Sequence, residues 1–293
     1  MQAASRRHTQ RFRRVLLWWL AFGCCCPWPT SAQEPAADSA PPRRVVSINL
    51  CTDQLAMLIA APGQLYSVSY LASQEGASVL ASEARAYVAN HGLAEEIFLM
   101  KPDLVLAGTF TSQATVTLLK RLGFRVETFA PDASFADISA NLRRMGALLG
   151  RQERTEELVA DLDRALDAPH SRTKRPLAAI YYPNSYTSGA GTLAGEVVER
   201  AGLENLAKRL GLEGTAQLPL EVLVIHAPDV IIGGERAPDG NVRAYANLTH
   251  PVLRALMKDR TQIALPDKYW VCGGPFTAEA VRILAASAAG AAR

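Results

Sequence analysis

The chain has few of the residues that metal sites require. It contains five cysteines and five histidines in 293 residues, and no two cysteines form a Cys-x-x-Cys pair. The histidines are scattered, without the spacing of paired metal ligands. We therefore expect no zinc site and no protein-built metal centre.

Recognisable catalytic motifs are also missing. The sequence has no G-x-S-x-G, no phosphate-binding P-loop and no H-E-x-x-H. A glycine-rich segment at 189–195, GAGTLAG, resembles a dinucleotide-binding loop. It begins about seven residues after its expected strand rather than directly after it, so we interpret it as a loop leading into a helix. The sequence favours a protein that is not an enzyme.

Long hydrophobic runs are absent beyond the N-terminus. Arginines precede an apolar run at 15–26, and Thr30 and Ala32 occupy the small-residue positions of a cleavage site. This is the pattern of a secretory signal, and the run is shorter than the roughly 20 residues of a membrane span. We expect a mature protein that begins at Gln33 in the periplasm. Cys24 leaves a lipoprotein anchor open, and paired arginines leave twin-arginine export open.

The apparent positive charge belongs to the expected signal. Without its five arginines, 26 basic residues remain against 28 acidic ones, so the mature chain gives no sign of nucleic-acid binding. No arginine cluster suited to a polyanionic ligand is visible either. Two cysteines, Cys51 and Cys272, and one tryptophan, Trp270, remain in the mature chain.

One segment occurs twice. Residues 95–108, EEIFLMKPDLVLAG, are followed 126 positions later by EVLVIHAPDVIIGG at 221–234, with Glu, Pro, Asp and Gly identical. Each copy predicts a short helix that ends before Pro102 or Pro228, then a buried strand that ends at Gly. The repeat predicts two related α/β lobes. The alternative is that a helix–Pro-Asp–strand unit, which is common in α/β proteins, recurs here by chance. The shared Glu would also suit a helix N-terminus.

Strands alternating with helices predict two lobes, each with a mainly parallel sheet flanked by helices. Thr52 is the expected N-cap of the first helix. We expect strands at 45–50, 64–70, 103–107, 124–130, 176–182 and 261–266, and helices at 112–122, 135–149, 192–202, 248–257 and 276–290. The predicted organisation is a signal at 1–32, a disordered tether at 33–42, an N-terminal lobe at 43–150, a long linker helix at 151–172 and a C-terminal lobe at 173–293.

Ligands of parallel α/β lobes bind beyond the carboxyl ends of the strands. The segments there are aromatic, hydroxylic and glycine-rich, which suits a large, weakly charged ligand. Cys51 and Cys272 each follow a strand in a different lobe, so we expect them near one another, either bonded or as two small buried side chains. The candidate ligand-binding residues are Asn49, Cys51, Thr52, Asp53, Tyr70, His91, Thr109, Phe110, Tyr186, Tyr269 and Trp270.

Five segments together resemble the periplasmic solute-binding proteins of ABC importers for iron–siderophore complexes and vitamin B12. They are VVSINLCTDQL, EEIFLMKPDLVLAG, YYPNSYTSGAGTL, LPLEVLVIHAPDVII and YWVCGGPFTAEAV, in order over residues 44–284. The resemblance implies two lobes bridged by one long helix, with a ferric siderophore or cobalamin in the cleft between them. It also implies a monomer that delivers this ligand to an ABC permease dimer in the inner membrane.

The resemblance assigns roles to particular residues. Glu95 and Glu221 match acids that pair with arginines on the two permease subunits. Tyr186 matches an aromatic residue of the cobalamin cleft, and the region of Tyr269 and Trp270 matches another. The chain lacks the tryptophans expected at Gly108 and near Ala89, which favours an iron chelate over cobalamin. An exported enzyme, or a metal- or haem-binding receptor on the same scaffold, is the alternative.

Overall fold

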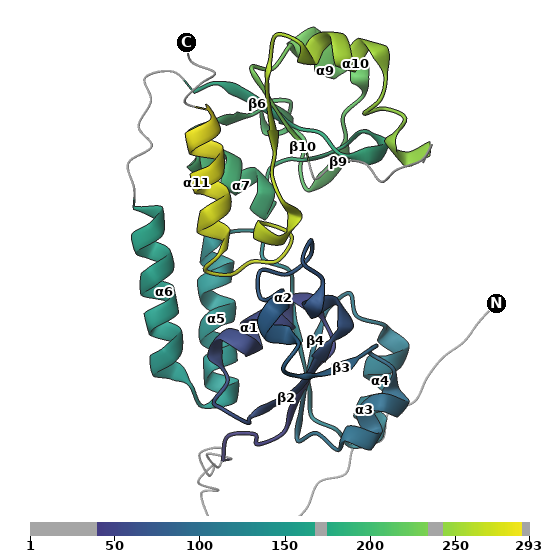
Figure 1. The fold of residues 1–293 in the computed structure, drawn as a ribbon, viewed down its shortest axis with the longest axis vertical. Helices are drawn as coiled ribbons and strands as arrows, with labels where there is room; N and C mark the ends of the chain where they lie inside the picture. The colour runs from purple at the N-terminus through teal and green to yellow at the C-terminus, as the bar shows by residue number, and fades with distance from the viewer. Residues whose placement is uncertain (1–39, 168–174, 234–242, 289–293) are drawn as a thin grey trace, which may run out of the picture. The chain divides into compact units, whose positions relative to one another are not determined.

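Two separate parallel sheets organise the chain in the computed structural model, which describes residues 40–167, 175–233 and 243–288 (Figure 1). The predicted two-lobed α/β fold is confirmed. The expected signal at 1–32, residues 33–39 of the expected tether and the end of the expected linker at 168–172 lie outside the described residues. Within the described ranges, no helix combines the length and apolar character needed to cross a membrane.

The N-terminal lobe is built on a five-stranded sheet, counted over the described residues, whose strands all run parallel in the order β3-β2-β1-β4-β5. Its elements are β1 (Val45–Ser47), α1 (Leu50–Ile59), β2 (Leu65–Ser69), the 3-10 helix η1 (Tyr70–Ser73), α2 (Ala81–Ala84), β3 (Val88–Asn90), α3 (Ala94–Met100), β4 (Leu104–Gly108), α4 (Gln113–Arg121), β5 (Val126–Phe129) and α5 (Phe135–Leu149).

Both faces of this sheet are buried, because successive side chains of a strand point to opposite faces. Val45 and Leu104 belong to the core that includes α1 and α5. Val46 and Val105 belong to a second core formed with α3 and α4. A strand that is buried on both faces must be largely apolar along its whole length. The continuous apolar runs of the sequence meet this requirement.

The C-terminal lobe contains a four-stranded parallel sheet, in the order β11-β10-β6-β8, and the antiparallel pair β7-β9, as far as the described residues extend. Its elements are β6 (Leu177–Ile180), η2 (Pro183–Ser185), β7 (Tyr186–Ser188), α7 (Leu193–Arg200), β8 (Glu204–Asn205), α8 (Leu206–Arg209), β9 (Thr215–Gln217), α9 (Leu220–His226), β10 (Val230–Gly233), η3 (Arg243–Tyr245), α10 (Pro251–Met257), β11 (Thr261–Ala264), η4 (Asp267–Tyr269) and α11 (Thr277–Ala288).

The repeated segment forms the same structure twice. Helix α3 leads into β4, and α9 leads into β10. Lys101 and Ala227, the residues before the two prolines, both adopt the left-handed conformation, with φ of 49° and 42°. The repeated aspartates also act alike: Asp103 accepts hydrogen bonds from the backbone amides of Arg43 and Arg44, and Asp229 accepts one from that of Leu177. Proline and aspartate in the repeat thus have structural roles.

A helical hairpin follows the N-terminal sheet, and its second helix, α6 (Gln152–Leu166), begins the expected linker. Gly150 separates α5 from α6 with φ of 67°, and a side chain there would meet Pro41 Cγ at 2.6 Å. Pro42 is buried and its carbonyl accepts a hydrogen bond from Gln64. The expected disordered tether was therefore too long at this end, because Pro41 and Pro42 pack against the N-terminal lobe.

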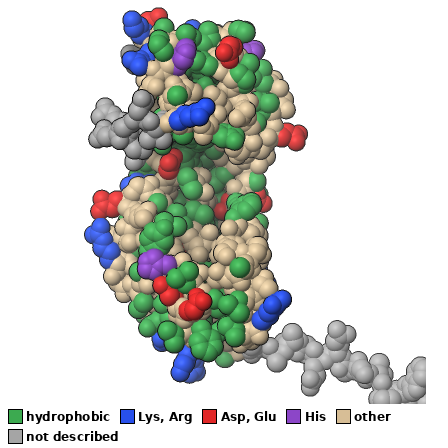
Figure 2. All heavy atoms as spheres, turned by 90° about the vertical axis from the view of Figure 1, so that its right-hand side faces the viewer, with side chains coloured by type: hydrophobic (Ala, Val, Ile, Leu, Met, Phe, Trp, Pro, Cys, Tyr) green, Lys and Arg blue, Asp and Glu red, His purple; other side chains and the backbone are tan. Residues whose placement is uncertain are grey.

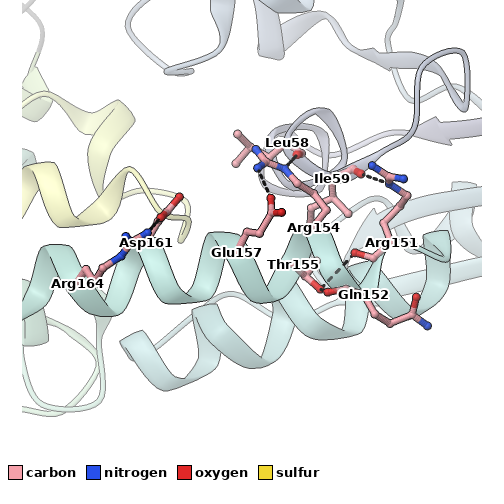
Figure 3. Close-up of polar contacts among 9 residues, drawn as sticks. All are labelled: Leu58, Ile59, Arg151, Gln152, Arg154, Thr155, Glu157, Asp161 and Arg164. Atoms are coloured by element: carbon pink, nitrogen blue, oxygen red, sulfur yellow. Dashed lines mark hydrogen bonds and ion pairs between the residues drawn. The ribbon is translucent and has the colours of Figure 1, made fainter.

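The first turns of α6 are held to the carboxyl end of α1 (Figure 3). Arg151 Nε donates to the Ile59 carbonyl and Arg154 Nε to the Leu58 carbonyl, each at 3.3 Å. The last carbonyls of a helix have no partner within it and carry partial negative charge. Since α1 has no basic residue in its own last turn, the linker supplies the cations.

Candidate ligand-binding site

Five candidate residues follow the strands of the N-terminal sheet at its carboxyl edge. Following the strand order across the sheet, they lie in the order His91, Tyr70, Asn49 and then Thr109 with Phe110. Phe110 is 88% exposed. The order changes direction between β1 and β4, which is where open α/β sheets bind ligands. The structure therefore brings these five predicted residues to one edge.

Tyr70 and His91 form a stacked pair. Their ring centroids are 5.3 Å apart and their planes differ by 27°. His91 Nδ1 lies 3.0 Å from Glu96 Oε1, and the His91 amide donates to Glu96 Oε2 at 2.7 Å. This backbone hydrogen bond is the largest cause that lowers the pKa of the Glu96 carboxyl. The acid orients the imidazole, so that a flat, exposed aromatic surface stands at this end of the edge.

Asn49 occupies the switch point between β1 and β4. Its Oδ1 accepts hydrogen bonds from the amides of Cys51 and Thr52, so Asn49 is the N-cap of α1 and the expected N-cap, Thr52, was wrong. A side chain at Gly108 would lie 2.8 Å from Asn49 Nδ2. The glycine at this position, where the resemblance leads one to expect tryptophan, leaves room for the asparagine.

Thr52 and Asp53, which were predicted as ligand contacts, do not reach the exposed edge of the sheet. Thr52 is 1% exposed and Asp53 is fully buried, because their side chains on the first turn of α1 face β1 and β2. Ser69 Oγ donates to Asp53 Oδ2 at 2.5 Å. Burial, the largest cause, raises the pKa of the Asp53 carboxyl from 3.8 to about 6, against smaller opposing effects of hydrogen bonds from Ser47 and Ser69.

Asp53 is expected to make the protein less stable as pH rises. Because its folded-state pKa lies above the unfolded value, the folded protein holds a proton that the unfolded chain releases, and this contribution is lost as pH rises from about 4 through 6. The shift corresponds to about 3 kcal/mol. Asp53→Asn should therefore be more stable than the wild type at pH 7 and similar at pH 4 in urea unfolding.

The exposed Asp259 supplies the matched control, and Asp259→Asn is measured at the same pH values. An Asp53→Asn variant whose free energy of unfolding follows pH as the wild type's does would contradict the expectation.

In the C-terminal lobe, the predicted aromatic residues differ in access. Tyr186 is exposed and Tyr269 is half-buried, whereas Trp270 is only 4% exposed. Trp270 contacts Tyr182 edge to face, with ring centroids 6.2 Å apart. Trp270, which was predicted as a direct ligand contact, has its ring in the core against Tyr182. Tyr182 lies just beyond the end of β6 and was not among the candidate ligand-binding residues.

Three buried polar atoms in this lobe have no hydrogen-bond partner among the described residues: Trp270 Nε1, Asn247 Oδ1 and Thr187 Oγ1. Asn247 Nδ2 donates to the Tyr182 carbonyl, so Asn247 and Trp270 both adjoin Tyr182. Buried polar groups are usually paired. No sequence signal marks Asn247, which lies just after η3.

The two lobes meet through covalent and polar contacts. Cys51 and Cys272 form a disulfide, with Cα atoms 5.1 Å apart, which is one of the two arrangements left open by the sequence. The Gly273 amide hydrogen-bonds the Asp132 carboxylate, and the Phe135 amide donates to Glu196 Oε2 at 3.2 Å. Figure 2 shows a hollow between the lobes with hydrophobic side chains on its walls. Cys51 is therefore a structural link as well as a residue of the ligand edge.

Glu95 and Glu221 lie on helices α3 and α9, away from the strand ends that carry the aromatic residues. Both are exposed. Neither carboxylate has a hydrogen bond or an ion pair within the part of the chain that the structure describes. In the same described part, no group of three His, Cys, Asp or Glu side chains is arranged to hold a metal ion.

Comparison with known proteins gives one family. The family model described as "Periplasmic binding protein" matches residues 45–257. A cobalamin-binding protein of Halobacterium salinarum is 28% identical over 228 residues, covering 72% of this chain and 60% of that protein. The chain thus spans about 60% of the length of this curated relative.

Solved structures share the fold. The periplasmic heme-binding protein RhuT from Roseiflexus sp. RS-1 superposes with a TM-score of 0.70 at 20% identity, covering 86% of this chain and 99% of that one. The periplasmic vitamin B12 binding protein BtuF of Vibrio cholerae gives a TM-score of 0.64 at 19% identity, with coverage of 86% and 99%. At these identities the similarity concerns the fold alone.

Proposed function

The chain belongs to the periplasmic binding protein family, and from this premise we propose that it is the substrate-binding component of an ABC importer for a large metal chelate. The proposed ligand is a corrinoid or a ferric siderophore, held in the hollow between the lobes. The protein would be exported by its N-terminal signal, act in the periplasm as a monomer and transfer its ligand to an inner-membrane permease dimer.

The chemistry of the strand ends carries this proposal. Phe110 and the Tyr70–His91 pair offer flat surfaces on one lobe, and Tyr186 and Tyr269 offer them on the other. Hydroxyl and amide groups accompany the rings, and no arginine is among the site residues. Flat, nearly neutral walls suit a broad ligand whose own charges are largely compensated.

A corrinoid and a ferric siderophore are favoured by different observations. The relative at 28% identity is named for binding cobalamin, which supports a corrinoid. Gly108 and Ala89 stand where the resemblance leads one to expect tryptophans, which supports a siderophore.

Haem is a second candidate, and Tyr70 and His91 favour it. Tyrosine and histidine both ligate haem iron in proteins. The two exposed rings lie together at the edge of the sheet, where either could meet a bound haem. This candidate retains the importer and changes only the cargo.

Calorimetric titration of the purified mature protein tests the proposal. Cyanocobalamin, a ferric hydroxamate siderophore and haemin should be compared, and we expect one of them to bind stoichiometrically with a dissociation constant below about 1 μM, equivalent to about −8 kcal/mol. A haem complex whose absorption spectrum changes in Tyr70→Phe would establish haem as the cargo. Absence of binding by all three would reject the chelate proposal, and chemical conversion of the ligand would indicate an enzyme.

Phe110→Ala is expected to weaken binding of that ligand about fivefold or more, because removing an aromatic anchor from an interface costs more than about 1 kcal/mol. The melting temperature should stay nearly constant, since the ring is 88% exposed. Phe98→Ala, an exposed ring on α3, is the matched control and should bind as the wild type does. Equal affinity of Phe110→Ala and the control would remove Phe110 from the site.

A further inference from the structure

The two copies of the repeat share an exposed apolar residue that the fold does not explain. Leu99 on α3 and Ile225 on α9 stand four residues after Glu95 and Glu221, and they are 77% and 78% exposed. By contrast Ile97, two residues after Glu95, is fully buried. Residues four apart lie on the same side of a helix. Each lobe therefore presents an acid and a branched apolar side chain together.

Single exposed apolar residues are ordinary. Leu99 and Ile225, however, are both large, apolar and exposed at the same position of the repeat. This agreement between the two lobes requires an explanation. The repeated Pro and Asp have structural partners, as described above. Leu99 and Ile225 fill no core, so folding does not account for them.

The surroundings of Leu99 widen the apolar surface. Phe98 is half-exposed, and Leu118 of α4 and Leu122, directly after α4, are similarly open. Together with Ala94 and Glu95 these residues line an open hollow of about 360 Å³. Glu95 is the only charged residue of its lining, whereas small-molecule sites have several convergent polar groups. An apolar surface with one acid at its rim is instead typical of a protein interface.

We propose that Leu99 with Glu95, and Ile225 with Glu221, form two equivalent contacts to a two-fold symmetric permease. Each permease subunit would supply an apolar recess beside a cationic side chain. The apolar residues contribute binding free energy when they leave water, and the acids fix orientation. This inference rests on the proposed function and adds to it the groups that provide affinity.

A second copy of this chain fits the same surface less well. In a symmetric dimer the same surface of two copies meets, so one contact would contain the acid of this surface from both copies. Like charges at an interface cost free energy. A partner with cations beside its recesses has no such penalty, which favours the permease over self-association.

The test uses membrane vesicles from the source organism with this gene deleted. Binding of purified mature protein is measured by co-sedimentation, which needs no ligand. Leu99→Ser and Ile225→Ser should each raise the dissociation constant about tenfold, and the double variant about a hundredfold, because the two sites are independent. Val88→Ser, at an exposed apolar residue of the edge strand β3, is the control and should bind normally.

The outcomes separate the two proposals. Saturable binding of the wild type that the double variant retains would overturn the apolar contacts and leave the importer function intact. No saturable binding by the wild type would overturn both. A wild-type dimer in gel filtration that the double variant converts to monomer would assign the surface to self-association and also overturn the inference. Melting temperatures of the variants should stay close to that of the wild type, because the substituted side chains are exposed.

Discussion

Replacing both Glu95 and Glu221 by arginine is expected to lower ligand uptake about a hundredfold or more, while ligand affinity and melting temperature stay nearly unchanged. Both carboxylates are exposed, and neither contacts another charged group within the described residues. Exposed ion pairs contribute only about 0–1 kcal/mol to folding, so stability does not require an acid here. At an interface with cations the substitution converts attraction into repulsion at two places.

The measurement is ATP-dependent uptake of the identified ligand into vesicles that contain the permease, with calorimetry and thermal unfolding of the same preparations. Glu83→Arg combined with Glu213→Arg is the matched control, because these acids are also exposed and lie one in each lobe. The control should support normal uptake. Full uptake with the Glu95 and Glu221 double variant, or loss of its ligand binding, would mean that these acids have another role.

Loss of the disulfide is expected to lower the free energy of unfolding by about 2–5 kcal/mol. The bond joins residues 221 positions apart, so it restricts most of the length of the unfolded chain, and long loops give the larger effects in the chain-entropy description. Cys51→Ala with Cys272→Ala removes the bond without leaving a free thiol. Urea unfolding should show a lower midpoint than the oxidised wild type.

Reductant provides the control for this expectation. It should shift the wild type towards the double variant and leave the double variant unchanged, since residues 33–293 contain no other cysteine. Two reactive thiols in the untreated wild-type protein, measured under denaturing conditions, would contradict the bond itself. Equal midpoints of wild type and variant would contradict its energetic role.

The larger elements could be predicted from the sequence because their signals are long and local. The strands β2, β4 and β5 and the helices α4 and α5 lie where apolar runs, helical periodicity and glycines place them. Gly150 ends α5 in a left-handed conformation, as a glycine after a helix commonly does. The strands β3 and β8, with three and two residues, were missed because they are too short to display a period.

The candidate site was predicted less completely, for a physical reason. Strand ends indicate which residues reach the edge of a sheet, and this placed Tyr70, His91 and Phe110 together. They do not indicate where each side chain points. Asp53 lies one turn into α1 with its carboxyl beneath the sheet edge, and Trp270 packs inward against Tyr182. Both orientations depend on contacts between elements that are distant in sequence.

The disulfide also orders the steps by which the molecule is made. Synthesis starts at the N-terminus, so Cys51 exists 221 residues before its partner. The N-terminal sheet is complete by Phe129 and can fold while the Cys51 thiol is still unpaired. In the native structure the bond joins a residue of the N-terminal lobe to one of the C-terminal lobe, with Cα atoms 5.1 Å apart. An intact native bond therefore reports that these two segments of different lobes lie next to one another.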